Sequence, residues 1–249
     1  MTKQPVLSHL EDLRWLIIRT VIYLLIASCL SFFIVDFIIE LAKLPSKGII
    51  TNFLILKPTE AITIYFKTII YSGLVISFFP ICYECIKFIA PALQKEQTIS
   101  IVKYSLSAFS LFILGTVFSY FIVLPNTIKF LINLSVHLTS SVPQFTLNSY
   151  ISFVFAVLLS GGIIFQIPLT CAILTTLQIV SPNTLKKFRK EVFFALCVFA
   201  AIITPTTDVF SLTLFVLPMV ILYEVGIFVS NIIYKKTITE DTIYGDTND

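Results

Sequence analysis

The feature that most constrains this chain is an apolar run over residues 192–231 that is interrupted only once. A helix needs about 20 apolar residues to cross a hydrocarbon layer of about 30 Å, so the run holds two spans. The interruption is TPTTD at residues 204–208. Pro205 disfavours helix in the residue before it, and Thr207 or Asp208 can cap the helix that follows. We therefore expect a helix break and an outer turn at Pro205 and Asp208.

The two arms of this hairpin differ from ordinary spans. Residues 192–203 would form only about 18 Å of helix, which is well short of a bilayer. We expect short fifth and sixth helices that thin the membrane or lie in a protein-lined recess. The second arm carries Pro218 and Glu224 within apolar sequence. A carboxylic acid at that depth is costly, so Glu224 is a functional-site candidate.

Other long apolar runs recur along the chain, which is 57% hydrophobic and only 12% charged. In lipid only helices or closed barrels satisfy the backbone, and barrel strands would alternate polar with apolar residues. The sequence therefore predicts an all-α polytopic membrane protein. Its net charge of +3 is too small to indicate a nucleic-acid partner.

We expect six transmembrane helices in a single domain of residues 1–249, with residues 1–14 as a polar amino-terminal segment and residues 234–249 as a polar acidic tail that is disordered from residue 240. The expected spans are residues 15–35, 61–81, 104–124, 150–177, 192–203 and 209–231. Residues 36–60 and 126–148 would lie on the outer side, the first as a helical or extended cap. Lys67, near the start of the second span, is expected to snorkel to the surface.

The positive charges predict the orientation of these spans. If the amino terminus is inside, inner segments hold 12 of the 17 basic residues, which favours both termini on the cytosolic, stromal or matrix side. The inner set is Lys3, Arg14, Arg19, Lys87, Lys95, Lys103, Lys186, Lys187, Arg189, Lys190, Lys235 and Lys236.

Several polar residues near or within the apolar runs have simple structural explanations. Ser8 and Glu11 have the spacing of a capping box that would start the first helix. Glu84 and Lys87 are one turn apart and could pair. Gln166 follows two glycines and precedes Pro168, a context that favours a kink and a hydrogen bond to another helix.

The sequence offers no sign of enzymatic chemistry. All five cysteines lie in apolar stretches, which favours packed thiols over disulfides. Cys82 and Cys85 form a lone C-x-x-C without the further ligands that a zinc site needs. We find no nucleophile with a base and no Gly-rich phosphate loop, so no catalytic residue, metal or cofactor is expected.

Four segments together resemble the TatC family, the multispanning receptor subunit of the twin-arginine protein translocase. Residues 9–14, HLEDLR, are similar to the family's H-L-x-E-L-R, with Asp12 in place of Glu and Leu16 where a second arginine is common. The other segments are residues 80–93, PICYECIKFIAPAL; residues 165–168, FQIP; and residues 203–226, in which ITPTTDVFS is followed by LP and LYEVG. The TPTTD form is close to the TPSTD of cyanobacterial and plastid members.

The resemblance implies a concave bundle that recognises twin-arginine signal peptides and nucleates a proton-gradient-driven translocase for folded proteins. Arginine is always charged and donates in a planar fork, so its receptor needs carboxylates on the inner side. We expect signal-peptide binding by Glu11, Asp12, Arg14 and Glu96. The family's loop acid falls at Gln97, and Glu96 stands one residue early. Gln166 and Glu224 would be polar groups of the concave face, although many members have Glu where this chain has Gln166.

The resemblance also implies partners and a membrane. We expect twin-arginine signal peptides, TatA/TatB-like single-span subunits, other copies of the chain and the lipid bilayer as partners. No Arg/Ser-rich leader precedes the first apolar run, which favours a bacterial or organelle gene. We expect the plastid thylakoid membrane first, then the mitochondrial inner membrane, then a bacterial plasma membrane.

Two other functions are compatible with the residues. A secondary transporter could use Gln166, Asp208 and Glu224 as a solute or proton path, although no internal repeat supports this. A structural or assembly subunit of an organellar membrane complex would need only the apolar helices. Uptake by liposomes containing only this chain, or co-purification with signal precursors, would separate these hypotheses.

Overall fold

The computed structural model describes residues 4–50, 52–89, 98–139, 144–203 and 209–245, and almost all of them are helical. Contacts group the chain into two compact units, residues 1–159 and residues 160–249. The expectation of one membrane domain stays a prediction.

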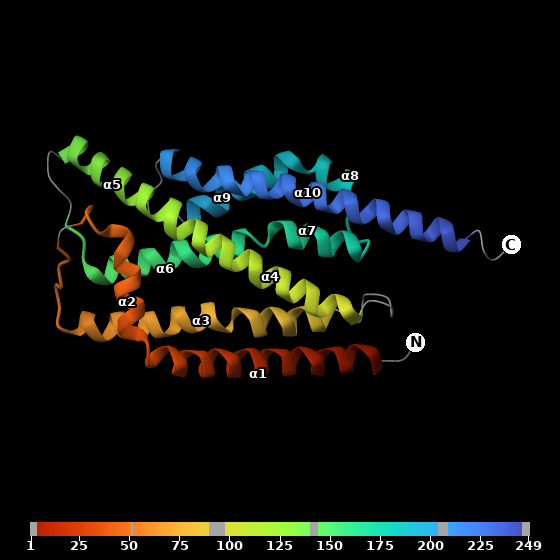
Figure 1. The fold of residues 1–249 in the computed structure, drawn as a ribbon, viewed down its shortest axis with the longest axis horizontal. Coiled ribbons are helices and arrows are strands. Elements are labelled where there is room, and N and C mark those ends of the chain that lie inside the picture. Colours follow the sequence, from red (N-terminus) through yellow and green to blue (C-terminus); the bar gives the residue numbers. More distant parts are fainter. Residues whose placement is uncertain (1–3, 51, 90–97, 140–143, 204–208, 246–249) are drawn as a thin grey trace. The chain divides into compact units, whose positions relative to one another are not determined.

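The first unit begins with a long helix and a short one, followed by two long helical segments (Figure 1). Its elements are α1 (Gln4–Phe32), α2 (Val35–Lys43), the 3-10 turn η1 (Leu44–Ser46), α3 (Thr59–Ile89), α4 (Thr98–Phe118), the π-helix η4 (Ser119–Val123), α5 (Leu124–Thr139) and the first part of α6 (Leu147–Ile164).

The second unit starts within α6. Its further elements are α7 (Ile167–Thr176), α8 (Pro182–Lys187), α9 (Arg189–Ile203) and α10 (Val209–Gly245). Helix α9 ends at Ile203 and α10 begins at Val209, on either side of the predicted helix break. Pro205 and Asp208 fall outside the described residues, so their capping and turn roles stay predictions.

Helices α1 and α3 pack antiparallel over most of their length (Figure 1). A glycine permits this close approach, because a Cβ on Gly73 would lie 3.1 Å from the Cα of Ser28. Small residues at such a crossing let two backbones approach closely in a membrane. The Gly73–Ser28 contact therefore sets which residues of α1 face which residues of α3.

Helix α1 begins at Gln4, so the prediction that Ser8 starts the helix is wrong. Pro5 stands in the first turn, where its missing N–H would have no intrahelical partner in any case. The segment expected as a polar lead-in is therefore mostly helical.

Helix α3 continues to Ile89 with Pro80 inside it, well beyond the expected end at residue 81. An internal proline removes one backbone hydrogen bond, and neighbouring helices in a membrane bundle tolerate this loss. The continuation places Glu84, Lys87 and Phe88 on a helix beside α1 instead of in a loop.

The third expected span also runs past its predicted end. The helix does not stop at Pro125 but passes through η4 into α5, which ends at Thr139. A π-helix bonds residue i to residue i+5, and this local change of register lets a helix accommodate Pro125. The expected outer segment 126–148 is therefore largely helical.

The two segments expected on the outer side meet in a cap. The Leu54 amide donates to Phe145 O at 3.0 Å, and the Leu147 amide donates to Leu54 O at 3.1 Å. The hydroxyl of Tyr150 donates to Ala42 O of α2 at 2.8 Å. The expectation of a helical or extended cap is confirmed.

Lys67 does not reach for the surface as expected. Its ammonium is half-buried and donates to Asn148 Oδ1 and Ser152 Oγ, each at 2.9 Å. Both partners are on α6. They accept hydrogen bonds from the ammonium of Lys67, which otherwise stands among apolar residues in the sequence of α3. The prediction of a snorkelling Lys67 is therefore wrong.

In the second unit α7 and α10 pack closely at a glycine. A Cβ on Gly226 would lie 3.0 Å from Cys171 Sγ and 3.3 Å from Pro168 Cα. The predicted kink is confirmed, since α6 ends at Ile164 and α7 begins at Ile167. All five cysteines are free thiols; Cys171 is packed as expected, whereas Cys29 is exposed.

Five helical stretches among the described residues are long and apolar enough to cross a membrane. They are Leu10–Phe32, Thr59–Phe88, Ile101–Leu138, Leu147–Thr176 and Phe215–Lys235. Helix α9 is short, as expected, with 15 residues. Helix α10 corrects the expectation of a short sixth helix and a disordered tail, because it extends over 37 residues to Gly245. No proline interrupts it after Pro218, and glycine is a common end of a helix.

Candidate functional site

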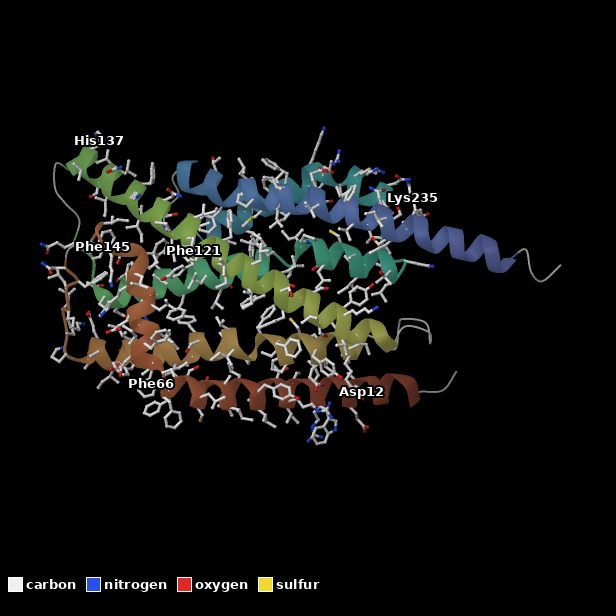
Figure 2. The ribbon with its side chains drawn as sticks, viewed as in Figure 1. Asp12, Phe66, Phe121, His137, Phe145 and Lys235 are labelled. Carbon is white, nitrogen blue, oxygen red and sulfur yellow. The ribbon has the colours of Figure 1, made fainter. Side chains whose placement is uncertain are left out.

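A groove of about 390 Å³ opens between α1 and α3, near the amino-terminal end of α1. Its walls are Asp12, Trp15, Leu16 and Arg19 of α1 and Glu84, Lys87 and Phe88 of α3. The α1 residues recur at intervals of three and four, which places them on one helical face. Figure 2 shows Asp12 and Phe145 at opposite ends of the first unit, so the groove and the cap lie far apart.

The structure separates the three predicted site residues at the start of α1. Asp12 lines the groove, whereas Glu11 and Arg14 are exposed on other parts of the helix surface. Asp12 is also exposed, and no ion pair engages it in the described part of the chain. Asp12 is therefore a carboxylate that is open to a cationic ligand.

Glu84 is the acid that sequence reasoning did not place in the site. Its Oε2 lies 3.1 Å from Arg19 Nη1, and its Oε1 accepts from the Tyr23 hydroxyl at 3.2 Å. The expected pair of Glu84 with Lys87 is wrong, because Glu84 is directed to α1. A signal was present in the sequence, since single opposite charges in two apolar helices are costly unless they meet.

The groove combines charges of both signs with aromatic walls. Asp12 and Glu84 are acidic, Arg19 and Lys87 are basic, and Trp15 and Phe88 are aromatic. A carboxylate accepts both N–H groups of a guanidinium, and an indole face attracts the same cation. The arrangement is suited to binding arginine side chains of a peptide.

The remaining predicted residues of the inner side and the membrane lie elsewhere. Glu96 is outside the described residues. Gln166 stands immediately before α7, half-buried, and its Nε2 donates to Gly162 O at 3.4 Å. This bond stays within the kinked α6–α7 segment, where it helps to satisfy a carbonyl that the helix break frees.

Glu224 of α10 is paired with Arg189, the first residue of α9. Its Oε2 lies 2.7 Å from Arg189 Nη2, and both side chains are about half exposed. The neighbouring Tyr223 donates its hydroxyl to Leu185 O at 2.8 Å. The segment LYEVG also includes Gly226, where α10 approaches α7 closely. Through these three residues the segment packs α10 against α7, α8 and α9.

Comparison with known proteins agrees with this geometry. A family model described as "Sec-independent protein translocase protein (TatC)" matches residues 8–218. The chain is 33% identical to the Sec-independent protein translocase protein TatC of Aquifex aeolicus, over 93% of this chain and 97% of that protein. It is 32% identical to a tatC-like protein, ycf43, of Gracilaria tenuistipitata var. liui, over 94% of this chain and 97% of that protein.

A solved structure is similar along nearly its whole length. The crystal structure of the twin arginine translocase receptor TatC superposes with a TM-score of 0.81 and 32% sequence identity, covering 90% of this chain and 99% of that one.

Proposed function

The chain belongs to the TatC family of Sec-independent protein translocase proteins, and from this membership we propose that it binds twin-arginine signal peptides through the groove between α1 and α3. It is a multi-pass membrane component of protein transport, and the family is not one of enzymes. One observation carries the proposal. The open carboxylate of Asp12 shares a groove with two aromatic side chains, Trp15 on α1 and Phe88 near the end of α3.

The chemistry of the groove fits the ligand. Two consecutive arginines carry permanent charge and planar donor groups, and carboxylates recognise both features. Asp12 accepts one guanidinium, while Trp15 and Phe88 cover its face. Glu96, between α3 and α4, supplies a further carboxylate, and Glu11 and Arg14 contact the peptide outside the groove.

A partner surface is proposed on the second unit. An apolar groove of about 370 Å³ lies on α9 and α10, and it would take the helix of a TatA/TatB-like single-span subunit. Its lining residues are Phe193, Cys197, Leu212, Thr213, Val216, Leu217, Val220 and Ile221. Further copies of the chain would join the same assembly, which would use the proton gradient.

The membrane arrangement is proposed from the charges and the helix lengths. Six spans result if α9 is counted with the five long stretches, and 12 of 17 basic residues then lie on the side of both termini. With only 15 residues α9 spans about 22 Å, so it would thin the bilayer locally. Gln166 and Glu224 would face the concave side along which the apolar part of the signal lies.

We place the protein in the thylakoid membrane of a plastid. The similarity to ycf43 and the TPTTD sequence support this location. Immunogold labelling or fractionation of thylakoids tests it, and recovery in a mitochondrial or plasma membrane would contradict it.

The decisive experiment is site-specific crosslinking to a precursor with a twin-arginine signal. Asp12→Asn removes the charge in the groove, and Glu11→Gln removes the same charge one residue away, outside the groove. We expect Asp12→Asn to reduce crosslinking roughly tenfold, as for a lost charge-assisted hydrogen bond, and Glu11→Gln to reduce it less. Equal crosslinking of twin-arginine and twin-lysine signals to the unmodified chain would contradict the proposed function.

A further inference from the structure

Glu84 is a carboxylate that already holds a guanidinium. Its side chain is only 10% exposed, and it accepts from both Arg19 and Tyr23. The pair joins residues that are 65 positions apart, on two different helices. A buried acid of this kind keeps its charge at low cost only while a cation remains beside it.

The cation on Glu84 is placed so that it can leave. The Arg19 side chain is 45% exposed, and its contact to Glu84 runs through a single nitrogen, Nη1. Arginine binds a carboxylate most strongly when two nitrogens donate in parallel. Arg19 thus makes the weaker form of the bond, and nearly half of its side chain is not covered by the protein.

Glu84 and the open carboxylate of Asp12 line the same groove. Asp12 and Arg19 are seven residues apart on α1, about 10 Å along the helix axis. Adjacent residues of an extended peptide direct their side chains to opposite sides. Two consecutive arginines can therefore reach two different carboxylates in this groove, one open and one occupied by Arg19.

We infer that Glu84 is a second guanidinium-binding carboxylate of the signal site, and that Arg19 occupies it until an arginine of the signal peptide displaces Arg19. The inference rests on the proposed function. Exchange of one guanidinium for another leaves Glu84 paired throughout, so the free chain never carries an unpaired buried acid. Arg19 then competes with the peptide for Glu84, and this competition lowers the affinity of peptides that lack an arginine at this position.

A double-mutant cycle tests the competition. The full chain in detergent is titrated with a fluorescent twin-arginine signal peptide, and Kd is measured for Arg19→Gln, Glu84→Gln and the double variant. We expect Arg19→Gln to lower Kd roughly three- to tenfold and Glu84→Gln to raise it roughly tenfold. In the Glu84→Gln background, Arg19→Gln should have no effect, because the two guanidiniums no longer compete for an acid.

Lys87→Gln is the matched control, since Lys87 is another cation of the groove. Its removal lowers the general repulsion of a cationic peptide, and this effect should persist in the Glu84→Gln background. An Arg19→Gln effect that also persists there would show general repulsion and overturn the inference.

A purely structural ion pair gives the opposite pattern. Both single variants would then raise Kd, and the double variant would restore it. Monodisperse elution of each variant guards against misfolding, and Arg19→Met provides a second test, because an uncharged thioether cannot pair with Glu84 and this variant should also lower Kd. Unchanged Kd in both Arg19 variants would overturn the inference. Failure of the unmodified chain to prefer twin-arginine over twin-lysine peptide would instead contradict the proposed function.

Discussion

Glu224 of α10 and Arg189 at the start of α9 form an ion pair of 2.7 Å that joins two helices of the second unit. The acid lies within the apolar stretch Phe215–Lys235, whereas the arginine is the first residue of α9. The pair explains how a carboxylate is tolerated among apolar residues, because a charge in lipid is stabilised by a nearby partner.

The two partners of this pair should not be equivalent. Arg189→Gln leaves a carboxylate alone in an apolar helix, while Glu224→Gln leaves an arginine that can extend to the interface. We expect Arg189→Gln to lower the melting temperature in nanodiscs more than Glu224→Gln does, with recovery in the double variant. Equal losses for both single variants would contradict this account.

Gly226 should tolerate no side chain. An added Cβ would meet Cys171 Sγ at 3.0 Å and Pro168 Cα at 3.3 Å. We expect Gly226→Ala to destabilise the protein by about 1–3 kcal/mol, as overpacking does. Cys171→Ala should rescue it only partly, because the backbone of Pro168 stays in place. Thermal unfolding in detergent measures both, and a neutral Gly226→Ala would show that α7 and α10 lie further apart.

Lys67 should be a structural cation. Lys67→Met leaves the half-buried Asn148 and Ser152 of α6 without their donor, and a hydrogen bond to a charged group contributes about 1.5–3 kcal/mol. Lys129→Met is the matched control, since Lys129 is exposed on α5. We expect Lys67→Met to lower the melting temperature more than Lys129→Met does. Equal shifts in the two variants would show that Lys67 has no special structural role.

Signal-peptide binding should depend on salt through Asp12. An exposed carboxylate is screened by ions over a Debye length of about 10 Å at 0.1 M. We expect Kd for the peptide to rise with ionic strength, and Asp12→Asn to reduce that dependence. Peptide titrations at several salt concentrations measure the slope, and an unchanged slope in Asp12→Asn would remove this carboxylate from the contact.

The helices could be predicted because lipid leaves the backbone no alternative. Long apolar runs must satisfy their own hydrogen bonds, so their class follows from composition alone. Their ends were harder to predict. Pro80 and Pro125 each indicate a helix end by their local chemistry, yet α3 continues through the first and a π-helix absorbs the second. Packing against neighbouring helices outweighs the local cost of a proline.

The site was predictable only in part. The motif around Asp12 and its resemblance to a family indicated the acid at the start of α1. The same reasoning did not identify Arg19 as a site residue, paired Glu84 with Lys87 and predicted that Lys67 reaches the surface. Sequence spacing shows which residues are neighbours within one helix, but it does not show which residues of two helices meet.

By itself, the sequence determined an all-helical membrane chain, the helix break after residue 203 and the family, because hydropathy, proline chemistry and motif spacing are local properties. Only the tertiary structure decided that Arg19 meets Glu84. That meeting depends on the register of α1 against α3, which the close contact of Gly73 with Ser28 sets far from either charge. A register is a property of two surfaces in contact, so neither helix specifies it alone.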